Sequence, residues 1–370
     1  MTKCIYIADL ILPNNSAYST HVLKMCDALS HKFKKVDLLV LNFINQINYY
    51  SFKKNYLFTS KNKFNIKKIL KIGAKSSFIN RLFFGFYASL YAKGSVGTLV
   101  ITRSFYASFF MSLFKVRHFL EIHNETKGLT KFIFLSLNFI NSKYIIKKIF
   151  ISRKLSKIFK AKNFIILHDS IDLKNFKNFK PVKKIKEVGY IGSLYDGRGI
   201  NIIIELSKLN PDLNFTIIGK KKRDKIDISE LSEIKNINIL NFVKYYKIPT
   251  LLKKFDILLM PYQKKVFVNS KNLNTANYCS PLKMFDYLAS GKIIISSKLD
   301  GIKEVLKNNF NSLLAKDDSV GSWNVALNKV KTLNKTKIKK ISKNAYDTST
   351  KNTWINRVNT IISYNKIWKY

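Results

Sequence analysis

Residues 187–209 read EVGYIGSLYDGRGINIIIELSKL, and this stretch decides the fold class. The first five residues form a short apolar run typical of a buried strand, and residues 200–209 place apolar side chains at helical spacing. The turn between them, residues 192–199, contains three glycines and Arg198. A strand, a glycine-rich turn and a helix in this order indicate one unit of a parallel α/β sheet. Glycines, free N–H groups at a helix start and an arginine also favour phosphate binding, the alternative being an ordinary connection.

Short apolar runs and helical patterns alternate on both sides of this stretch. This alternation predicts two doubly wound, Rossmann-like α/β domains facing a cleft, with ligands at the carboxyl ends of the strands. We place the boundary between them within residues 172–186, which contain a proline and no clear period. The expected strands are 4–8, 36–42, 98–102, 118–122, 148–152, 164–168, 187–191, 214–218, 237–240, 256–261 and 292–296. The expected helices include 18–30, 200–209, 247–255, 281–290 and 301–306.

The net charge of +44 indicates either a composition rich in lysine or an anionic partner. No acidic residue occurs between Asp37 and Glu121, and aromatic clusters lie in the same region. We therefore expect this region to bind an anionic membrane surface, through lysines around an apolar helix face within residues 64–72. A nucleic acid is the less favoured partner, because no aromatic-rich binding signature accompanies the charge.

Cysteine usage and hydropathy predict where the protein resides. Its three cysteines are odd in number and widely spaced, which suits a reducing compartment better than a disulfide framework. The sequence contains no apolar stretch of membrane-spanning length, and the N-terminus lacks the regions of a signal peptide. We expect a cytoplasmic protein that attaches peripherally to the inner face of the cell membrane.

Residues 277–292, NYCSPLKMFDYLASGK, are the second candidate site. Ser280 is a suitable N-cap and Pro281 a suitable first residue for a helix. Lys283 and Asp286 are three residues apart, so that one helix face presents a cation and a carboxylate to a phosphate and a sugar hydroxyl. The alternative is a capped surface helix with a Lys–Asp pair.

Both segments resemble the group 1 (family 4) glycosyltransferases of the GT-B fold. Residues 192–199 resemble the G-R-L-x-x-x-K-G loop of that family, and residues 280–292 resemble its P-x-K-x-x-E-Y-x-A-x-G-K-P helix. Further resemblances occur in family order at residues 167–172, 217–219, 255–261 and 301–305.

This resemblance implies a retaining transfer of a sugar from a nucleotide-diphosphate sugar to a hydroxyl acceptor, such as a glycolipid or surface-polysaccharide intermediate. It implies an acceptor domain over residues 1–178, a sugar-donor domain over 179–345, and a helix over 346–370 that returns to the first domain. Arg198, Lys283 and His123 would act in catalysis. The residues implied in binding the sugar donor are Gly192, Ser193, Gly199, Gly219, Asn277, Tyr278, Ser280, Pro281, Leu282 and Asp286, with Asp286 on the ribose.

The sequence departs from the family pattern at two positions of the expected site. Ser193 stands where the family has an arginine, so Lys283 would supply the second charge. Tyr278 stands where the family has the first glutamate of its E-x7-E pair. These departures keep a catalytically inactive scaffold of the same fold as an alternative. The sequence has no Asp-x-Asp pair and no metal-ligand spacing among its histidines, so we expect neither a cofactor nor a required metal ion.

Overall fold

The computed structural model describes residues 2–43, 48–69, 77–176, 182, 184–219, 234–266, 274–316 and 318–367. The chain divides into a first unit, Met1–Asp169 with Trp354–Tyr370, and a second unit, Ser170–Thr353. The first unit therefore ends before the expected limit of residue 178. The chain returns to it only at Trp354, because the helix that contains Tyr346 belongs to the second unit.

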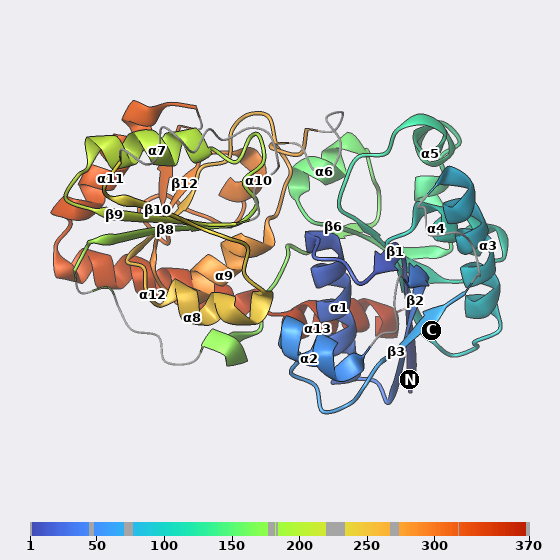
Figure 1. Cartoon of the computed structure of the whole chain (residues 1–370). Coiled ribbons are helices and arrows are strands. Elements are labelled where there is room, and N and C mark those ends of the chain that lie inside the picture. Colours follow the sequence, from blue (N-terminus) through green and yellow to red (C-terminus); the bar gives the residue numbers. More distant parts are fainter. Residues whose placement is uncertain are drawn as a thin grey trace. The chain divides into compact units, whose positions relative to one another are not determined.

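The first unit is built on a parallel seven-stranded sheet with the order β3-β2-β1-β4-β5-β6-β7 (Figure 1). Its elements are β1 (Lys3–Leu12), α1 (Ala17–Ser30), β2 (Lys35–Phe43), α2 (Tyr49–Tyr56), β3 (Asn65–Lys68), α3 (Phe78–Lys93), β4 (Leu99–Thr102), α4 (Phe105–Leu113), β5 (His118–Ile122), α5 (Gly128–Lys131), η1 (Phe132–Ser136), η2 (Phe139–Asn141), β6 (Ile145–Phe150), α6 (Arg153–Ile158), β7 (Phe164–Ile166) and α13 (Trp354–Ile367).

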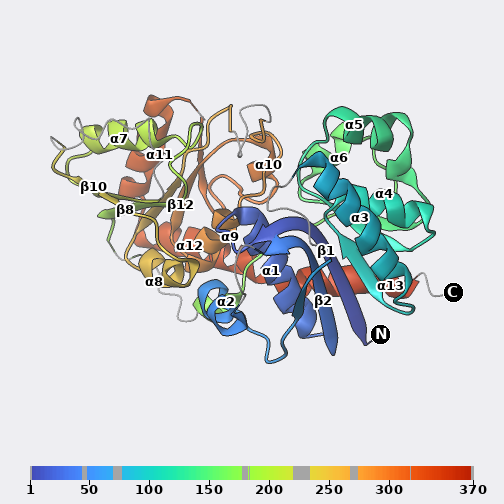
Figure 2. The same ribbon diagram turned by 45° about the vertical axis from the view of Figure 1, so that its right-hand side comes forward.

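Alternate side chains of β1 point to opposite faces of this sheet. Ile5 and Ile7 pack in a buried cluster with Phe84 of α3 and Met111 of α4. On the other face, Tyr6 hydrogen-bonds to a carboxylate of β5. Helix α13 packs beside α1 and contacts β6. Helices α13 and α1 thus lie side by side in one layer of the first unit (Figure 2).

The second unit is built on a six-stranded parallel sheet with the order β10-β9-β8-β11-β12-β13. Its elements are η3 (Leu173–Phe176), β8 (Glu187–Ile191), α7 (Ile200–Leu209), β9 (Asn214–Ile218), β10 (Ile237–Leu240), η5 (Tyr245–Lys247), α8 (Ile248–Leu252), β11 (Ile257–Met260), α9 (Leu282–Ser290), β12 (Ile293–Ser297), α10 (Asp300–Lys303), β13 (Leu313–Ala315), α11 (Val320–Thr332) and α12 (Lys335–Lys351).

Two apolar clusters cover the faces of the second sheet. Alternate strand residues such as Ile257 and Leu259 pack with α7 and α11, whereas Leu258 and Met260 pack with α8 and α9. The strand order reverses between β8 and β11, and ligands of doubly wound sheets bind beyond the carboxyl ends at such a reversal. The glycine-rich turn directly follows β8 at this position.

Two local predictions are wrong. The segment expected to form an amphipathic helix within residues 64–72 contains the edge strand β3, and residues 70–72 lie outside the described part of the chain. Lys67 of β3 forms an ion pair with the buried Asp37 of β2, so this lysine joins two neighbouring strands of the sheet. In the second motif, the N-cap of α9 is Pro281 without a side-chain cap bond, and Ser280 precedes it.

Candidate functional site

The glycine-rich turn after β8 packs closely against the end of β11. Gly199 has a φ of +67°, and a Cβ built on it would lie 1.9 Å from the carbonyl oxygen of Pro261. No other residue fits this combination of backbone angle and close approach. Gly199 is also the N-cap of α7, with no side-chain cap bond. The first N–H groups of α7 are therefore available to a ligand beside this turn.

Arg198 lies directly before this helix start, with its guanidinium carbon 4.5 Å from the ring centroid of Tyr262. Its Nε is buried and has no hydrogen-bond partner among the described residues. Tyr262 follows β11, so the two strands at the reversal supply the arginine and the ring that supports it. A cation held on an aromatic face keeps its hydrogen-bonding edge for another group.

Lys283 brings a second cation from α9 to the same place. Its Nζ lies 3.9 Å from the ring centroid of Tyr190 and 5.4 Å from that of Tyr262. A Cβ built on Gly192 would lie 2.2 Å from this Nζ, so the glycine leaves room for the ammonium group. Burial and the nearby charge of Arg198 hold the pKa of Lys283 well below its ordinary value.

The two cations form a positive pocket that lacks a matching anion. The Nζ of Lys283 is buried without a hydrogen-bond partner in the described part of the chain, as is the Nε of Arg198. None of the ion pairs between described residues includes either side chain. Asp286 offsets the charge of Lys283 only in part. Because unpaired buried charge destabilises a fold, the pocket is suited to bind an anion such as a diphosphate.

Helix α9 is held in place at the end of β8. The hydroxyl of Tyr287 accepts a hydrogen bond of 2.9 Å from the backbone N–H of Ile191. Asp286 is buried, and its Oδ1 accepts a hydrogen bond of 2.9 Å from Tyr245. Tyr245 thus fixes the orientation of Asp286, the residue expected to bind the ribose, and the sequence patterns did not indicate this tyrosine.

The other expected sugar-donor residues also lie in the second unit. A Cβ built on Gly219 would lie 1.8 Å from the carbonyl oxygen of Gly192, so the turns after β8 and β9 touch. Ser193 and Asn277 are exposed, and their side chains are accessible to a ligand. Tyr278 and Ser280 are buried, whereas Pro281 and Leu282 are partly exposed at the start of α9.

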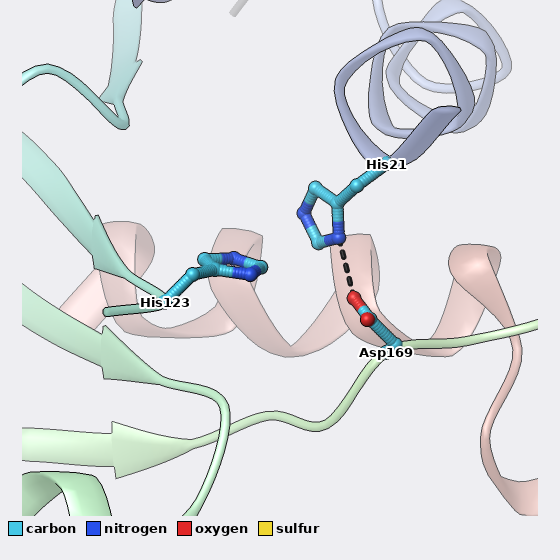
Figure 3. Close-up of side chains that lie close together, drawn as sticks. All are labelled: His21, His123 and Asp169. Carbon is cyan, nitrogen blue, oxygen red and sulfur yellow. Dashed lines mark hydrogen bonds and ion pairs between the residues drawn. The ribbon is translucent and has the colours of Figure 1, made fainter. Parts of the chain in front are cut away.

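His123 belongs to the first unit, at the end of β5, in a cluster of buried charged groups. His21, His123 and Asp169 point toward one another from α1, from β5 and from the loop after β7 (Figure 3). His21 Nδ1 lies 2.6 Å from Asp169 Oδ1, and the rings of His21 and His123 are 4.5 Å apart. His21 Nε2 and His123 Nε2 lie 2.8 and 3.1 Å from Glu121 Oε1.

This cluster is hydrogen-bonded. Ligand atoms of His21, His123 and Asp169 lie within 4.8 Å of one another, which is compatible with a metal site on distance alone. However, two ligands of one ion at ~2.1 Å each would be ~3 Å or more apart, so the 2.6 Å contact of His21 with Asp169 is a hydrogen bond.

Sequence reasoning missed the groups that support each cluster. Tyr190 and Tyr262 hold the cations of the second unit, but an isolated tyrosine near a strand end carries no distinguishing pattern. In the first unit, His21, Asp169 and Arg357 are more than a hundred residues apart along the chain and meet only through the fold.

Residues 172–348 match the family described as glycosyl transferases group 1. The second unit is a group 1 glycosyltransferase domain. The chain therefore contains a glycosyltransferase domain, and the two cations at the reversal of the sheet lie within it.

Solved glycosyltransferase structures share the GT-B fold with the described part of this chain. A glycosyltransferase from Rickettsia africae ESF-5 is 13% identical, covers 100% of both chains and has a TM-score of 0.75. Anabaena Alr3699/HepE, in complex with UDP and glucose, is 12% identical over 98% of this chain and 99% of its own, with a TM-score of 0.70. WaaG, a glycosyltransferase involved in lipopolysaccharide biosynthesis, is 11% identical over 99% and 100%, with a TM-score of 0.63.

No curated protein matches the glycosyltransferase sequence. None of the helices within the described residues has both the length and the apolar character needed to cross a membrane.

Proposed function

We propose that this glycosyltransferase moves a sugar from a nucleotide-diphosphate sugar to a hydroxyl acceptor with retention of the anomeric configuration. The observation that carries the proposal is that Arg198 and Lys283 both face the ring of Tyr262, each with a buried nitrogen that has no hydrogen-bond partner among the described residues. The relative crystallised with UDP and glucose supports a UDP-sugar as the first donor to test.

The main chemical task of the second unit is to stabilise the leaving diphosphate. Negative charge accumulates on this group as the bond to the sugar breaks, and fixed cations lower the energy of that state. Arg198 provides a forked hydrogen-bond donor and Lys283 a point charge. The uncapped start of α7 adds backbone N–H groups and the positive end of the helix dipole.

His123 provides a neutral imidazole in the first unit. Burial, together with the charges of Arg103 and His21, lowers the pKa of His123 to about 3. The ring is therefore uncharged at neutral pH. Its resemblance to the first-domain histidine of group 1 enzymes supports a place beside the transferred sugar, where a ring nitrogen would accept a hydrogen bond from a hydroxyl group.

We propose that the reaction requires no divalent metal ion. Arg198, Lys283 and the start of α7 supply the positive charge that a metal would otherwise bring to the diphosphate. Transfer rates measured with EDTA and with added Mg²⁺ or Mn²⁺ test this. Rates within about twofold of each other support it, whereas a loss of tenfold or more with EDTA contradicts it.

A membrane surface is the proposed location of the acceptor, in keeping with the relative involved in lipopolysaccharide biosynthesis. Helix α3 carries large apolar side chains on one exposed stripe, with Ile79 60% and Phe83 51% exposed and Tyr87 and Leu90 continuing the stripe. No acidic residue lies between positions 37 and 121, so this stripe suits a glycolipid in an anionic bilayer.

Sedimentation with vesicles tests this surface. The parent should bind anionic vesicles and release them at high salt, and the double variant Ile79→Ser, Phe83→Ser should lose most of that binding. Val96→Ser is the matched control, because Val96 is 94% exposed but lies outside α3. Equal binding by the parent and the double variant would contradict the assignment.

A transfer assay tests the chemical proposal. A panel of nucleotide sugars is incubated with the protein and saccharide acceptors, and NMR determines the anomeric configuration of the product. Arg198→Ala should lower turnover by about 100-fold or more, because a contact of ~3 kcal/mol that strengthens in the transition state has this effect. Turnover within about threefold of the parent would place the diphosphate elsewhere.

A further inference from the structure

We infer that Arg357, on the C-terminal helix α13, is a positioning residue that fixes the ring of His123 through Glu121. The inference rests on the proposed function in one respect, namely that His123 faces the transferred sugar. It goes further by making the last helix of the chain a part of the transfer site.

Glu121 is the centre of this arrangement. The side chain is fully buried on β5, where Tyr6 donates a hydrogen bond to Oε2 and Arg357 donates one to Oε1. Burial would raise the pKa of Glu121, but the charges of His21 and Arg357 hold it well below its ordinary value. The carboxylate is therefore ionised, and an ionised carboxylate only accepts hydrogen bonds.

The ionised carboxylate determines which nitrogen of His123 carries the hydrogen. His123 Nε2 lies 3.1 Å from Glu121 Oε1, so Nε2 must donate. The ring is neutral, because its pKa is lowered to about 3, and so Nδ1 keeps its lone pair. The cluster thus presents one defined nitrogen of His123 as a hydrogen-bond acceptor for a ligand.

His21 contacts both carboxylates of the cluster. Its two ring nitrogens face carboxylate oxygens, with Glu121 at 2.8 Å and Asp169 at 2.6 Å. The His21 ring also stacks edge-on against the rings of His123 and Trp354. The indole of Trp354, which begins α13, thereby packs against the cluster.

Arg357 brings a positive charge to Glu121, and its guanidinium is itself held by the backbone. One Nη donates to Glu121, and the other donates to the carbonyl oxygens of Leu167 and His168. A guanidinium can make these contacts together because its donors form a rigid fork, whereas a lysine cannot reproduce them. Without this group, Glu121 would lose its orientation, and His123 would no longer be held in a single tautomer.

Histidine NMR on the full chain, labelled with ¹⁵N in its imidazole rings, tests the inference without reference to activity. In the parent, His123 should show the pattern of a ring protonated only at Nε2. In Arg357→Met, the same ring should show a mixture of tautomers. Asn359→Met is the matched control, because Asn359 is exposed on the same helix, and it should leave the parental pattern unchanged.

Kinetics on the same variants test the consequence for transfer. Arg357→Met should lower kcat by about tenfold or more, since misplacing a reacting group by ~1 Å can cost ~100-fold. Its affinity for a nucleoside diphosphate should stay within about twofold of the parent, because that site lies in the second unit. If Arg357→Met does not fold, Arg357→Lys is used instead. In this variant His123 should show a mixture of tautomers, and kcat should fall by about threefold or more.

Two results would overturn the inference. The first is a folded Arg357→Met or Arg357→Lys with the parental tautomer. The second is parental kcat in such a variant despite a mixed tautomer. A failure of the proposed function looks different, because the parent itself would then neither bind a nucleoside diphosphate nor transfer a sugar.

Discussion

A buried ammonium group such as that of Lys283 destabilises the folded chain until an anion neutralises it. Lys283→Met keeps most of the side-chain volume and removes the charge. We expect this variant to unfold at a higher temperature, by roughly 2–8 °C for a gain of about 1–2 kcal/mol, and to lose most of its affinity for a nucleoside diphosphate. Calorimetry on both proteins measures both effects, with Lys298→Met at an exposed position as the control. A variant that is less stable but binds normally would contradict this account.

The gain in stability from Lys283→Met depends on pH in a defined direction. The pKa of Lys283 is lowered in the folded chain from its ordinary value of 10.5. Below the lowered pKa both the folded and the unfolded chain carry the charge, so its burial is fully penalised. The gain should therefore be largest at pH values below the lowered pKa and disappear as the pH rises above the ordinary value. Thermal unfolding of parent and variant across this range checks it, and a gain that grows with pH would contradict it.

The lowered pKa of Lys283 also predicts that ligand binding takes up a proton. Between the lowered pKa and the ordinary value, Lys283 is neutral in the free protein, and a diphosphate beside it favours the charged form. Titration calorimetry in buffers of different ionisation enthalpy measures this uptake. Lys283→Met should abolish it. The same uptake in the variant would assign the proton to another group.

At the scale of the element, the position of α9 depends on the bond between Tyr287 and Ile191. Tyr287→Phe leaves a buried N–H without its partner and should lower the free energy of unfolding by about 1–3 kcal/mol. Because Lys283 is on the same helix, the affinity for a nucleoside diphosphate should fall as well. Tyr246→Phe, at a partly exposed tyrosine of η5, is the control. Reduced stability together with parental affinity would show that the position of α9 does not affect binding of the nucleoside diphosphate.

Helices and strands whose apolar residues recur at a regular spacing were predicted with the limits that the structure shows. Strands 187–191, 214–218 and 237–240 and helix 200–209 agree with the structure, because each is an uninterrupted apolar or helical pattern. Residues 64–72 were predicted wrongly, since Phe64 and Ile66 also fit the two-residue period of a strand. Strand β13 was missed because three residues are too few to establish any period.

At the scale of the whole molecule, the chain crosses from its first unit to its second and then returns. The apolar stripe of Trp354, Val358 and Ile361 was predictable and is buried in the first unit. The clusters of charge were less predictable. The motifs identified Arg198, Lys283 and His123, but the contacts of Arg357 and Asp169 depend on pairings between distant segments.

A chain that ends at residue 353 tests the role of this return. Removal of α13 exposes the apolar surface that Trp354, Val358 and Ile361 cover, and it leaves Glu121 without Arg357. We expect the first unit to lose its cooperative unfolding and become sensitive to proteases, while the second unit still binds a nucleoside diphosphate. A first unit as resistant as in the parent would contradict the importance of the returning helix.

The most direct test of the central claim compares the binding of a nucleoside diphosphate with that of its free nucleoside by titration calorimetry. The claim is that Arg198 and Lys283 form the diphosphate site of the sugar donor. The parent should bind the diphosphate at least about tenfold more tightly than the nucleoside, because charge-assisted contacts contribute ~1.5–3 kcal/mol. Arg198→Ala should remove most of this difference, and Lys298→Ala should preserve it. Equal affinities in the parent for every nucleotide tested, or a full difference retained in Arg198→Ala, would contradict the claim.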